Sequence, residues 1–186
     1  EILELLAKTF LLTGDRVIMP WPSFAMYPLV AQGMGAEPVR VPLTADMQHD
    51  FPALTREVAV GAKMVFLCNP NNPTGTSFGA GELADFVSGI PDDVILVIDE
   101  AYYEFLDTPP DTLKFVRDGR NVVVLRTFSK IQGLAALRIG YGELGGDAVE
   151  FLARGGGKLG QQLERRIRGQ RVLLDLQAVR ARVCIF

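Results

Sequence analysis

The chain has little of the chemistry that disulfide scaffolds, metal sites and histidine-based catalysis require. Its 186 residues include two cysteines, Cys68 and Cys184, and one histidine, His49. The cysteines are far apart in the sequence and show no C-x-x-C pairing, which favours a reducing, cytoplasmic setting. A single histidine supports neither a histidine-rich metal site nor a Ser-His triad. Its position near Asp46 and Asp50 predicts a solvated loop.

Long apolar runs and a strong net charge are also missing. No run of roughly 18 apolar residues occurs, so no membrane span is expected, and the first residues show no signal-peptide pattern. The formal net charge is −3, which gives no electrostatic reason to expect nucleic acid as a partner. With 48% hydrophobic and 22% charged residues, the composition is that of a soluble globular protein with a sizeable core.

The chain does contain short, continuous, β-branched runs that are each followed by a polar segment. These runs are residues 64–68, 94–98 and 122–125, and the polar segments after them are 69–75, 99–103 and 126–130. Such runs predict strands buried on both faces, and helix-like stretches such as 81–87 separate them. Strands that alternate with helices predict an α/β fold with a mostly parallel sheet.

The other segments complete this order. Helices are predicted over residues 2–12, 24–32 and 51–60, and strands over 17–19 and 39–41. Asp111 is predicted to be the N-cap of the short helix that follows the loop at 108–111.

Candidate functional residues lie just past the ends of three predicted strands. Parallel sheets bind ligands outside the carboxyl ends of their strands, so we expect Asn72, Asp99 and Lys130 on one rim. A lysine in a small-polar loop can hold a carbonyl cofactor as a Schiff base. Arg138 follows eight residues later and can clamp a phosphate. Most lysines are solvated surface groups, so Lys130 and Arg138 alone do not indicate a cofactor site. The neighbouring motifs have to support that interpretation.

Those motifs resemble the fold-type I pyridoxal-phosphate (PLP) aminotransferases, the aspartate aminotransferase superfamily. The resemblance covers residues 1 to about 142, and within the superfamily the histidinol-phosphate aminotransferase group is the most similar. It rests on Asn69-Pro70-Asn71-Asn72-Pro73-Thr74-Gly75, on Asp99-Glu100-Ala101-Tyr102-Tyr103-Glu104-Phe105, and on Thr127-Phe128-Ser129-Lys130 with the segment 133–140. The resemblance implies a three-layer αβα, PLP-binding large domain, here partial, over residues 1–142.

The resemblance also implies catalytic roles. Lys130 would hold the cofactor aldehyde and, once freed, move a proton between the substrate Cα and the cofactor. Asp99 would keep the pyridine nitrogen protonated, so that the ring can accept electrons. Asn72 and Tyr102 would hydrogen-bond the phenolic oxygen of the cofactor. The alternatives are a helix N-cap for Asp99, a turn residue for Asn72 and a half-buried strand-edge aromatic for Tyr102.

Four further residues complete the implied cofactor site. Thr127, Ser129 and Arg138 would form the phosphate cradle, since hydroxyls and a guanidinium suit a dianion. Phe24 would stack on the cofactor ring. A core aromatic is the alternative for Phe24, and the neighbouring Trp21 competes with it for the stacking role.

The implied function is transamination of histidinol phosphate with 2-oxoglutarate or glutamate, in histidine biosynthesis, by a cytoplasmic homodimer that binds neither membrane nor nucleic acid. Two alternatives stay open. One is another class I/II PLP enzyme, such as an aromatic or branched amino-acid aminotransferase or a threonine-phosphate decarboxylase-like protein. The other is the aminotransferase-like sensor domain of a transcription regulator.

Residues 143–186 depart from the family pattern. From residue 150 onward eight lysines and arginines stand against three acidic residues, a balance of +5, while the rest of the chain carries −8. The open interpretations are a solvated amphipathic helix over 159–180, a basic tail for anionic surfaces, or a segment foreign to the family, produced by a frame shift or a chimeric gene model.

The chain is also shorter than members of the superfamily. It begins with Glu1 and lacks both the phosphate-contacting turn that precedes this point in the family and an assignable carboxylate-binding arginine. The expectation is a fragment that does not catalyse transamination by itself.

Overall fold

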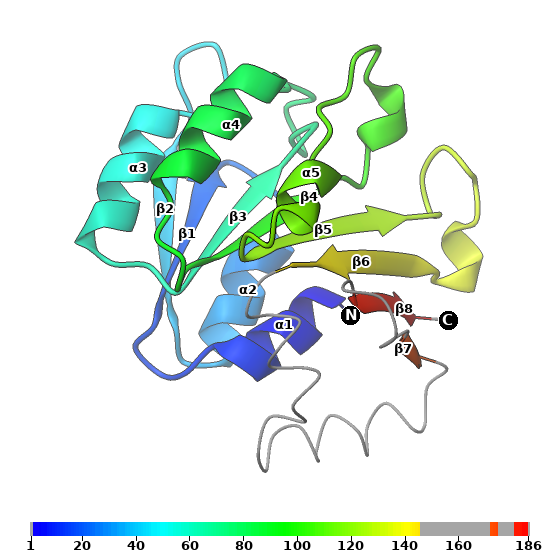
Figure 1. The fold of residues 1–186 in the computed structure, drawn as a ribbon, viewed down its shortest axis with the longest axis horizontal. Helices are drawn as coiled ribbons and strands as arrows, with labels where there is room; N and C mark the ends of the chain where they lie inside the picture. Colours follow the sequence, from blue (N-terminus) through cyan, green and yellow to red (C-terminus); the bar gives the residue numbers. More distant parts are fainter. Residues whose placement is uncertain (1, 146–171, 175–180, 186) are drawn as a thin grey trace.

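The computed structural model describes residues 2–145, 172–174 and 181–185, and Figure 1 shows its ribbon. The described helices are α1 (Ile2–Phe10), α2 (Met26–Gly33), α3 (Phe51–Val60), α4 (Ala80–Gly89) and α5 (Leu113–Arg117), with short 3-10 helices η1 (Tyr103–Phe105) and η2 (Ala135–Leu137). The described strands are β1 (Arg16–Trp21), β2 (Glu37–Pro42), β3 (Met64–Cys68), β4 (Ile95–Asp99), β5 (Val122–Thr127), β6 (Gly140–Leu144), β7 (Val172–Leu174) and β8 (Ala181–Ile185).

The described strands form one sheet in the order β2-β1-β3-β4-β5-β6-β8-β7. Strands β1 to β5 are parallel to one another, whereas β6 runs antiparallel to β5, and β8 runs antiparallel to both β6 and β7. The mostly parallel α/β sheet predicted from the alternation of strands and helices is therefore confirmed.

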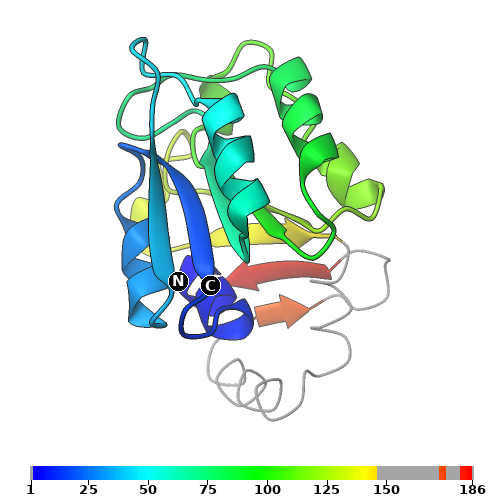
Figure 2. The same cartoon turned by 90° about the vertical axis from the view of Figure 1, so that its left-hand side faces the viewer.

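Helices cover both faces of the parallel strands, which gives three layers. Helices α3, α4 and α5 lie on one face and α1 and α2 on the other (Figures 1 and 2). Successive strand residues point to opposite faces, so Phe66 of β3 packs in the cluster under α1 and α2, and Leu67 packs in the cluster under α3 and α4. Burial on both faces explains why these strands appear in the sequence as continuous apolar runs.

The register of the central strands brings their carboxyl ends level. Cys68 pairs with Asp99, and Asp99 pairs with Leu125. The polar segments that follow β3, β4 and β5 therefore leave the sheet at the same edge, as parallel pairing requires.

Two helices and one cap differ from prediction. The helix predicted for residues 2–12 ends at Phe10, and that predicted for 24–32 begins at Met26. The prediction of Asp111 as a helix N-cap is wrong, because Thr112 is the N-cap residue of α5. Asp111 instead forms an exposed ion pair with Arg117, six residues along.

The prediction of a solvated His49 is also wrong. The His49 side chain is only 5% exposed. It lies against the rings of Phe51 and Phe78, with centroids 6.1 and 5.1 Å away. Neither ring nitrogen has a hydrogen-bond partner among the described residues. Its acidic sequence neighbours gave a polar context, but the aromatic residues that follow in the chain enclose it.

The predictions for the C-terminal segment fall mostly on residues outside the described part. Of the helix predicted over 159–180, only Val172–Leu174 are described, and they form strand β7. Among the described residues, no helix is long and apolar enough to cross a membrane.

Candidate functional site

A cavity of about 440 Å³ opens at the carboxyl ends of β4 and β5. Ile2 and Leu3 of α1 form one wall, so the first helix of the chain helps to enclose it. Six residues that were predicted to contact the cofactor line this cavity together: Phe24, Asp99, Thr127, Ser129, Lys130 and Arg138.

Asp99 is the buried acid of the site. Its side chain is 9% exposed, and its Oδ2 accepts a hydrogen bond of 2.9 Å from the Tyr27 hydroxyl. Its Oδ1 accepts a 3.1 Å bond from the backbone N–H of Ala101, so it also caps the turn after β4. Burial raises the pKa of Asp99, while these two hydrogen bonds and the charge of Lys130 lower it.

Lys130 lies beyond the end of β5 and is exposed. Its Nζ lies 4.7 Å from the centroid of the Tyr102 ring, which connects the loop after β5 to the turn after β4. Tyr102 and Asn72 do not line the Asp99 cavity. They face an adjacent hollow of about 360 Å³, which Pro70, Phe105 and Leu106 also line.

Thr127, Ser129 and Arg138 are brought together by the hairpin between β5 and β6. The Thr127 hydroxyl donates to the Ile139 carbonyl at 3.2 Å and accepts from the Ser129 N–H at 3.2 Å. Arg138 adopts a φ of 54°, a left-handed conformation that costs a non-glycine residue about 1–2 kcal/mol. Arg138 is exposed, and its guanidinium donates to the nearby Ala135 carbonyl at 3.2 Å.

Phe24, rather than Trp21, lines the cavity. Trp21 instead carries the Arg40 guanidinium over its ring, 4.9 Å from the centroid. Phe24 stands edge-on to Tyr27, with ring centroids 5.6 Å apart at 86°. Its position matches both the stacking role and the alternative of a partly buried core aromatic.

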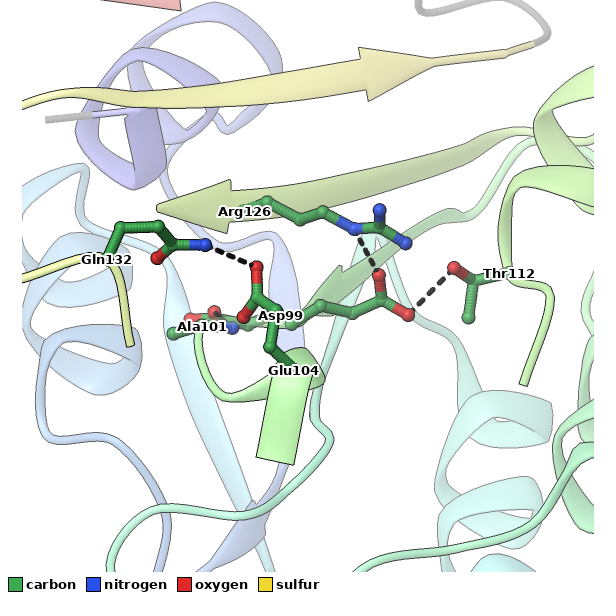
Figure 3. A network of polar contacts seen from close by, with 7 residues as sticks. Asp99, Ala101, Glu104, Thr112, Arg126 and Gln132 are labelled. Atoms are coloured by element: carbon green, nitrogen blue, oxygen red, sulfur yellow. Dashed lines mark hydrogen bonds and ion pairs between the residues drawn. The ribbon is translucent and has the colours of Figure 1, made fainter. Parts of the chain in front are cut away.

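A second polar network lies beside Asp99 (Figure 3). Arg126 donates from Nε to Glu100 at 2.8 Å, and Thr112 donates to the other Glu100 oxygen at 2.7 Å. The Arg126 guanidinium also lies 3.9 Å from the centroid of the Tyr103 ring. Burial outweighs the help of Thr112 and Arg126 and raises the pKa of Glu100 to about 6. The carboxylate raises the pKa of Arg126 in turn.

The loop after β3 is held by side-chain amides. Asn69 bonds both backbone groups of Phe78, at 3.1 and 3.2 Å. Asn71 accepts from the Ser23 hydroxyl at 2.7 Å and donates to the Pro22 carbonyl at 3.1 Å, which joins this loop to the segment after β1. These contacts set the backbone path that presents Asn72.

The sequence did not predict three polar groups of the site: Arg126, which lines the cavity, and Tyr27 and Glu100, which hydrogen-bond to residues of its lining. Glu100 and Arg126 belong to the quoted motifs, and an adjacent acid and a strand-end arginine could have been proposed as a pair. Nothing in the sequence signals that Tyr27 reaches Asp99, since 72 residues separate them. Among the described residues, no group of three or more His, Cys, Asp or Glu side chains could hold a metal ion.

The arrangement places a buried carboxylate, a primary amine and a guanidinium around one cavity with an aromatic wall. The carboxylate can stabilise a cationic ring nitrogen, the amine can form a bond to a carbonyl, and the guanidinium can bind a phosphate. These are the groups that a phosphorylated, heteroaromatic carbonyl compound would need.

Comparison with known proteins agrees with this arrangement. Residues 1–158 match the family model for aminotransferase class I and II. A histidinol-phosphate aminotransferase of Symbiobacterium thermophilum is 51% identical over 142 residues, which are 76% of this chain and 39% of that protein. An aromatic amino acid aminotransferase of Rhodococcus jostii is 49% identical over 128 residues, which are 69% of this chain and 36% of that protein.

A solved structure gives the same result. The histidinol-phosphate aminotransferase of Sinorhizobium meliloti, determined in complex with pyridoxal-5'-phosphate, superposes with a TM-score of 0.75 at 29% identity. The superposition covers 86% of this chain and 43% of that one. The chain thus spans about two fifths of the length of the curated relatives it matches. It belongs to the class I and II aminotransferases.

Proposed function

We propose that this chain forms the cofactor-binding part of a PLP-dependent aminotransferase that acts on histidinol phosphate, with 2-oxoglutarate or glutamate as the second substrate. The observation that carries the proposal is the buried Asp99 carboxylate, which faces the same cavity as Lys130 and Arg138. The relatives and the solved structure with pyridoxal-5'-phosphate support it.

The residues of the cavity fit this cofactor. A buried carboxylate is costly unless a cation or hydrogen-bond donors compensate it, and a protonated ring nitrogen is such a cation. In the proposed site Asp99 holds that nitrogen, Phe24 contacts the ring, and Ser129, Thr127 and Arg138 bind the phosphate. When bound, PLP supplies an electron sink for the carbanion that forms at the substrate Cα.

Lys130 supplies the proton chemistry in this proposal, and Tyr102 binds the cofactor beside it. The Lys130 amine would hold the cofactor aldehyde and, when free, would take up the proton that leaves the substrate Cα. Lys130 is exposed, and its ammonium contacts the Tyr102 ring. Its amine therefore has room to move between the cofactor aldehyde and the substrate Cα. Asn72 and Tyr102 bind the phenolic oxygen of the cofactor from the neighbouring hollow.

The domain assignment is part of the proposal. Residues 1–142 form part of the PLP-binding large domain, and residues 143–186 a basic segment that departs from the family. Because the near-attack geometry of a substrate requires several convergent groups, and the chain offers no assignable arginine for the substrate carboxylate, the isolated chain is inactive in this proposal. The complete protein is a cytoplasmic homodimer without membrane or nucleic-acid partners.

Labelling at Lys130 tests the cofactor assignment. The protein, with any sequence that its gene adds at either end, is incubated with PLP, reduced with borohydride and digested. Mass spectrometry should find the cofactor on Lys130, and Lys130→Ala should remove the label. Lys63 precedes β3 and is not among the residues that line the cavity, so Lys63→Ala is the matched control variant and should label normally. A label on another lysine would refute the assignment.

An aromatic amino-acid aminotransferase is the second candidate, because the Rhodococcus jostii relative is nearly as similar as the histidinol-phosphate enzymes. Turnover of histidinol phosphate against phenylalanine and tyrosine by the same preparation separates the two. A higher kcat/KM for an aromatic amino acid would replace the first candidate by the second.

A further inference from the structure

Tyr27 is the largest fully buried side chain whose polar atom reaches the cavity residues. It lies in α2 with no exposed surface, and its hydroxyl donates to Asp99 Oδ2 at 2.9 Å. A buried phenol needs an acceptor, and here the acceptor is the carboxylate assigned to the cofactor nitrogen.

The position of the phenol is fixed by its ring contacts. The Tyr27 ring stacks on Phe66 of β3, with centroids 4.6 Å apart and planes 3° apart. Phe24 packs edge-on against its other side, at 5.6 Å. Offset stacked and edge-to-face pairs are the favoured aromatic geometries, so the ring is held from two directions. The hydroxyl therefore reaches Asp99 from a rigid support rather than from a mobile side chain.

The titratable groups around Asp99 show why the hydrogen bond from Tyr27 matters for the charge of the Asp99 carboxylate. Cys68 of β3 faces it from one side, and burial together with the Asp99 charge raises the pKa of Cys68 to about 12, so the thiol stays neutral. Burial, followed by the Asp99 charge, also raises the pKa of Tyr27, so the phenol keeps its proton and remains a donor. Glu100 adds a second negative charge from the same strand end. Lys130 contributes the positive charge nearby.

We propose that Tyr27 is a positioning residue for the transamination site: its hydroxyl fixes the Asp99 carboxylate and keeps it ionised toward the cavity. This inference rests on the proposed function for the role of Asp99. A purely structural role would need only the ring, because phenylalanine would make the same contacts with Phe66 and Phe24. The hydroxyl is the part that the packing does not explain.

Tyr27→Phe tests the inference by removing one oxygen and keeping the ring. In the protein without cofactor, infrared difference spectra against Asp99→Asn isolate the titration of the Asp99 carboxyl. Asp99 should titrate at higher pH in Tyr27→Phe than in the wild type, because the variant loses a hydrogen bond to the ionised form. Tyr103→Phe is the matched control, since Tyr103 contacts Arg126 by its ring and not Asp99. It should leave the titration unchanged.

The holoenzyme supplies a second readout. The acidic limb of the kcat profile should move to higher pH in Tyr27→Phe, with kcat about tenfold lower on that limb, as expected for one lost hydrogen bond to a charged group. An unchanged Asp99 titration in a folded Tyr27→Phe protein would overturn the inference. A shifted titration with no label on Lys130 would instead overturn the proposed function, so the two failures are distinguishable.

A second variant tests the role of the Tyr27 hydroxyl if Tyr27→Phe does not fold. Replacing Tyr27 by 3-fluorotyrosine keeps the size of the side chain and makes its hydroxyl a stronger donor. Asp99 should then titrate at lower pH than in the wild type, opposite to the shift in Tyr27→Phe. An Asp99 titration that does not respond to the stronger donor would overturn the inference.

Discussion

The candidate site has two sides that differ in how firmly they are held. The anchored side consists of Tyr27, Asp99, Glu100 and Arg126, which are buried or half-buried and joined by hydrogen bonds of 2.8–2.9 Å within two networks. The open side is the hairpin at 128–139, which carries Lys130 and Arg138. Residues 130–138 are all exposed, and their described polar links to the rest of the fold are few.

The difference follows from where each side is built. The anchored side consists of residues in α2, in β5 and at the end of β4. The side chains of these strands are packed on both faces of the sheet. The hairpin is held mainly by its own backbone bonds, such as Leu134 N–H to Phe128 O at 3.0 Å. Among the described residues, side-chain bonds also join it to Thr127 at the end of β5 and, through Gln132, to Glu104 at 2.8 Å. The carboxylate proposed to hold the ring nitrogen is thus preorganised, while the lysine proposed to bind the cofactor aldehyde keeps its freedom to move.

The largest expected effect separates the two sides by their stability. In the holoenzyme, Lys130→Ala and Asp99→Ala should each lower kcat by about 10²-fold or more, because in the proposed function Lys130 moves the substrate proton and Asp99 holds the ring nitrogen. Lys130→Ala should change the free energy of unfolding by less than about 0.5 kcal/mol, since it is exposed. Asp99→Ala should cost about 1–3 kcal/mol, because it leaves the buried Tyr27 hydroxyl without its acceptor.

Activity assays and urea unfolding of the two variants check this contrast. Equal losses of stability would show that the hairpin is as firmly built as the end of β4. Near-normal turnover of Asp99→Ala would reduce Asp99 to the cap of the turn at Ala101 and remove the basis of the proposed function.

His49 extends the comparison to a buried group that has no hydrogen bond at all among the described residues. Burial lowers its pKa from 6.5 to about 4. Its folded pKa is below its unfolded pKa, so its contribution to stability is present above pH 6.5 and is lost as the pH falls through 4. The loss should amount to about 2–3 kcal/mol.

His49→Leu should remove this loss, because leucine can occupy the space between Phe51 and Phe78 without titrating. The measurement is the free energy of urea unfolding of both proteins at pH 7 and pH 4. Since His49 is the only histidine, the difference between the two proteins isolates its titration. Parallel acid dependence in both proteins would mean that His49 is solvated, as the sequence predicted.

The sequence carried most of the fold, because local patterns determine it. Continuous apolar runs located β3, β4 and β5 to within one or two residues, and the parallel sheet followed from their alternation with helices. The failures concern side-chain environment. Asp111 has the chemistry of a cap but lies one residue too early, and His49 has acidic neighbours in sequence but aromatic neighbours in space.

For the candidate site, too, local sequence patterns predicted some residues and could not predict others. Asn72, Asp99 and Lys130 follow three apolar runs of the sequence and could be expected on one rim, since parallel strands end at the same edge. Asp99 and Lys130 line one cavity with Phe24, whereas Asn72 faces the adjacent hollow. Tyr27 could not be placed, because its contact with Asp99 depends on how α2 packs across β3, and no sequence period specifies that contact.

The smallest expected effect concerns Glu100, the second acid of the anchored side. Its pKa is raised by burial from 4.5 to about 6. Its folded pKa is above its unfolded pKa, so the stabilising contribution is fully present below pH 4.5 and is lost as the pH rises through 6.

Glu100→Gln should remove this loss, about 1–2 kcal/mol, while keeping an acceptor for Thr112 or Arg126. Urea unfolding at pH 4.5 and pH 7 measures it, and the slope should be opposite in sign to that of His49. If Glu100→Gln kept the pH dependence of the wild-type free energy of unfolding, Arg126 would compensate the Glu100 carboxylate fully. Asp99 would then be the one acid of the anchored side whose pKa is raised by burial.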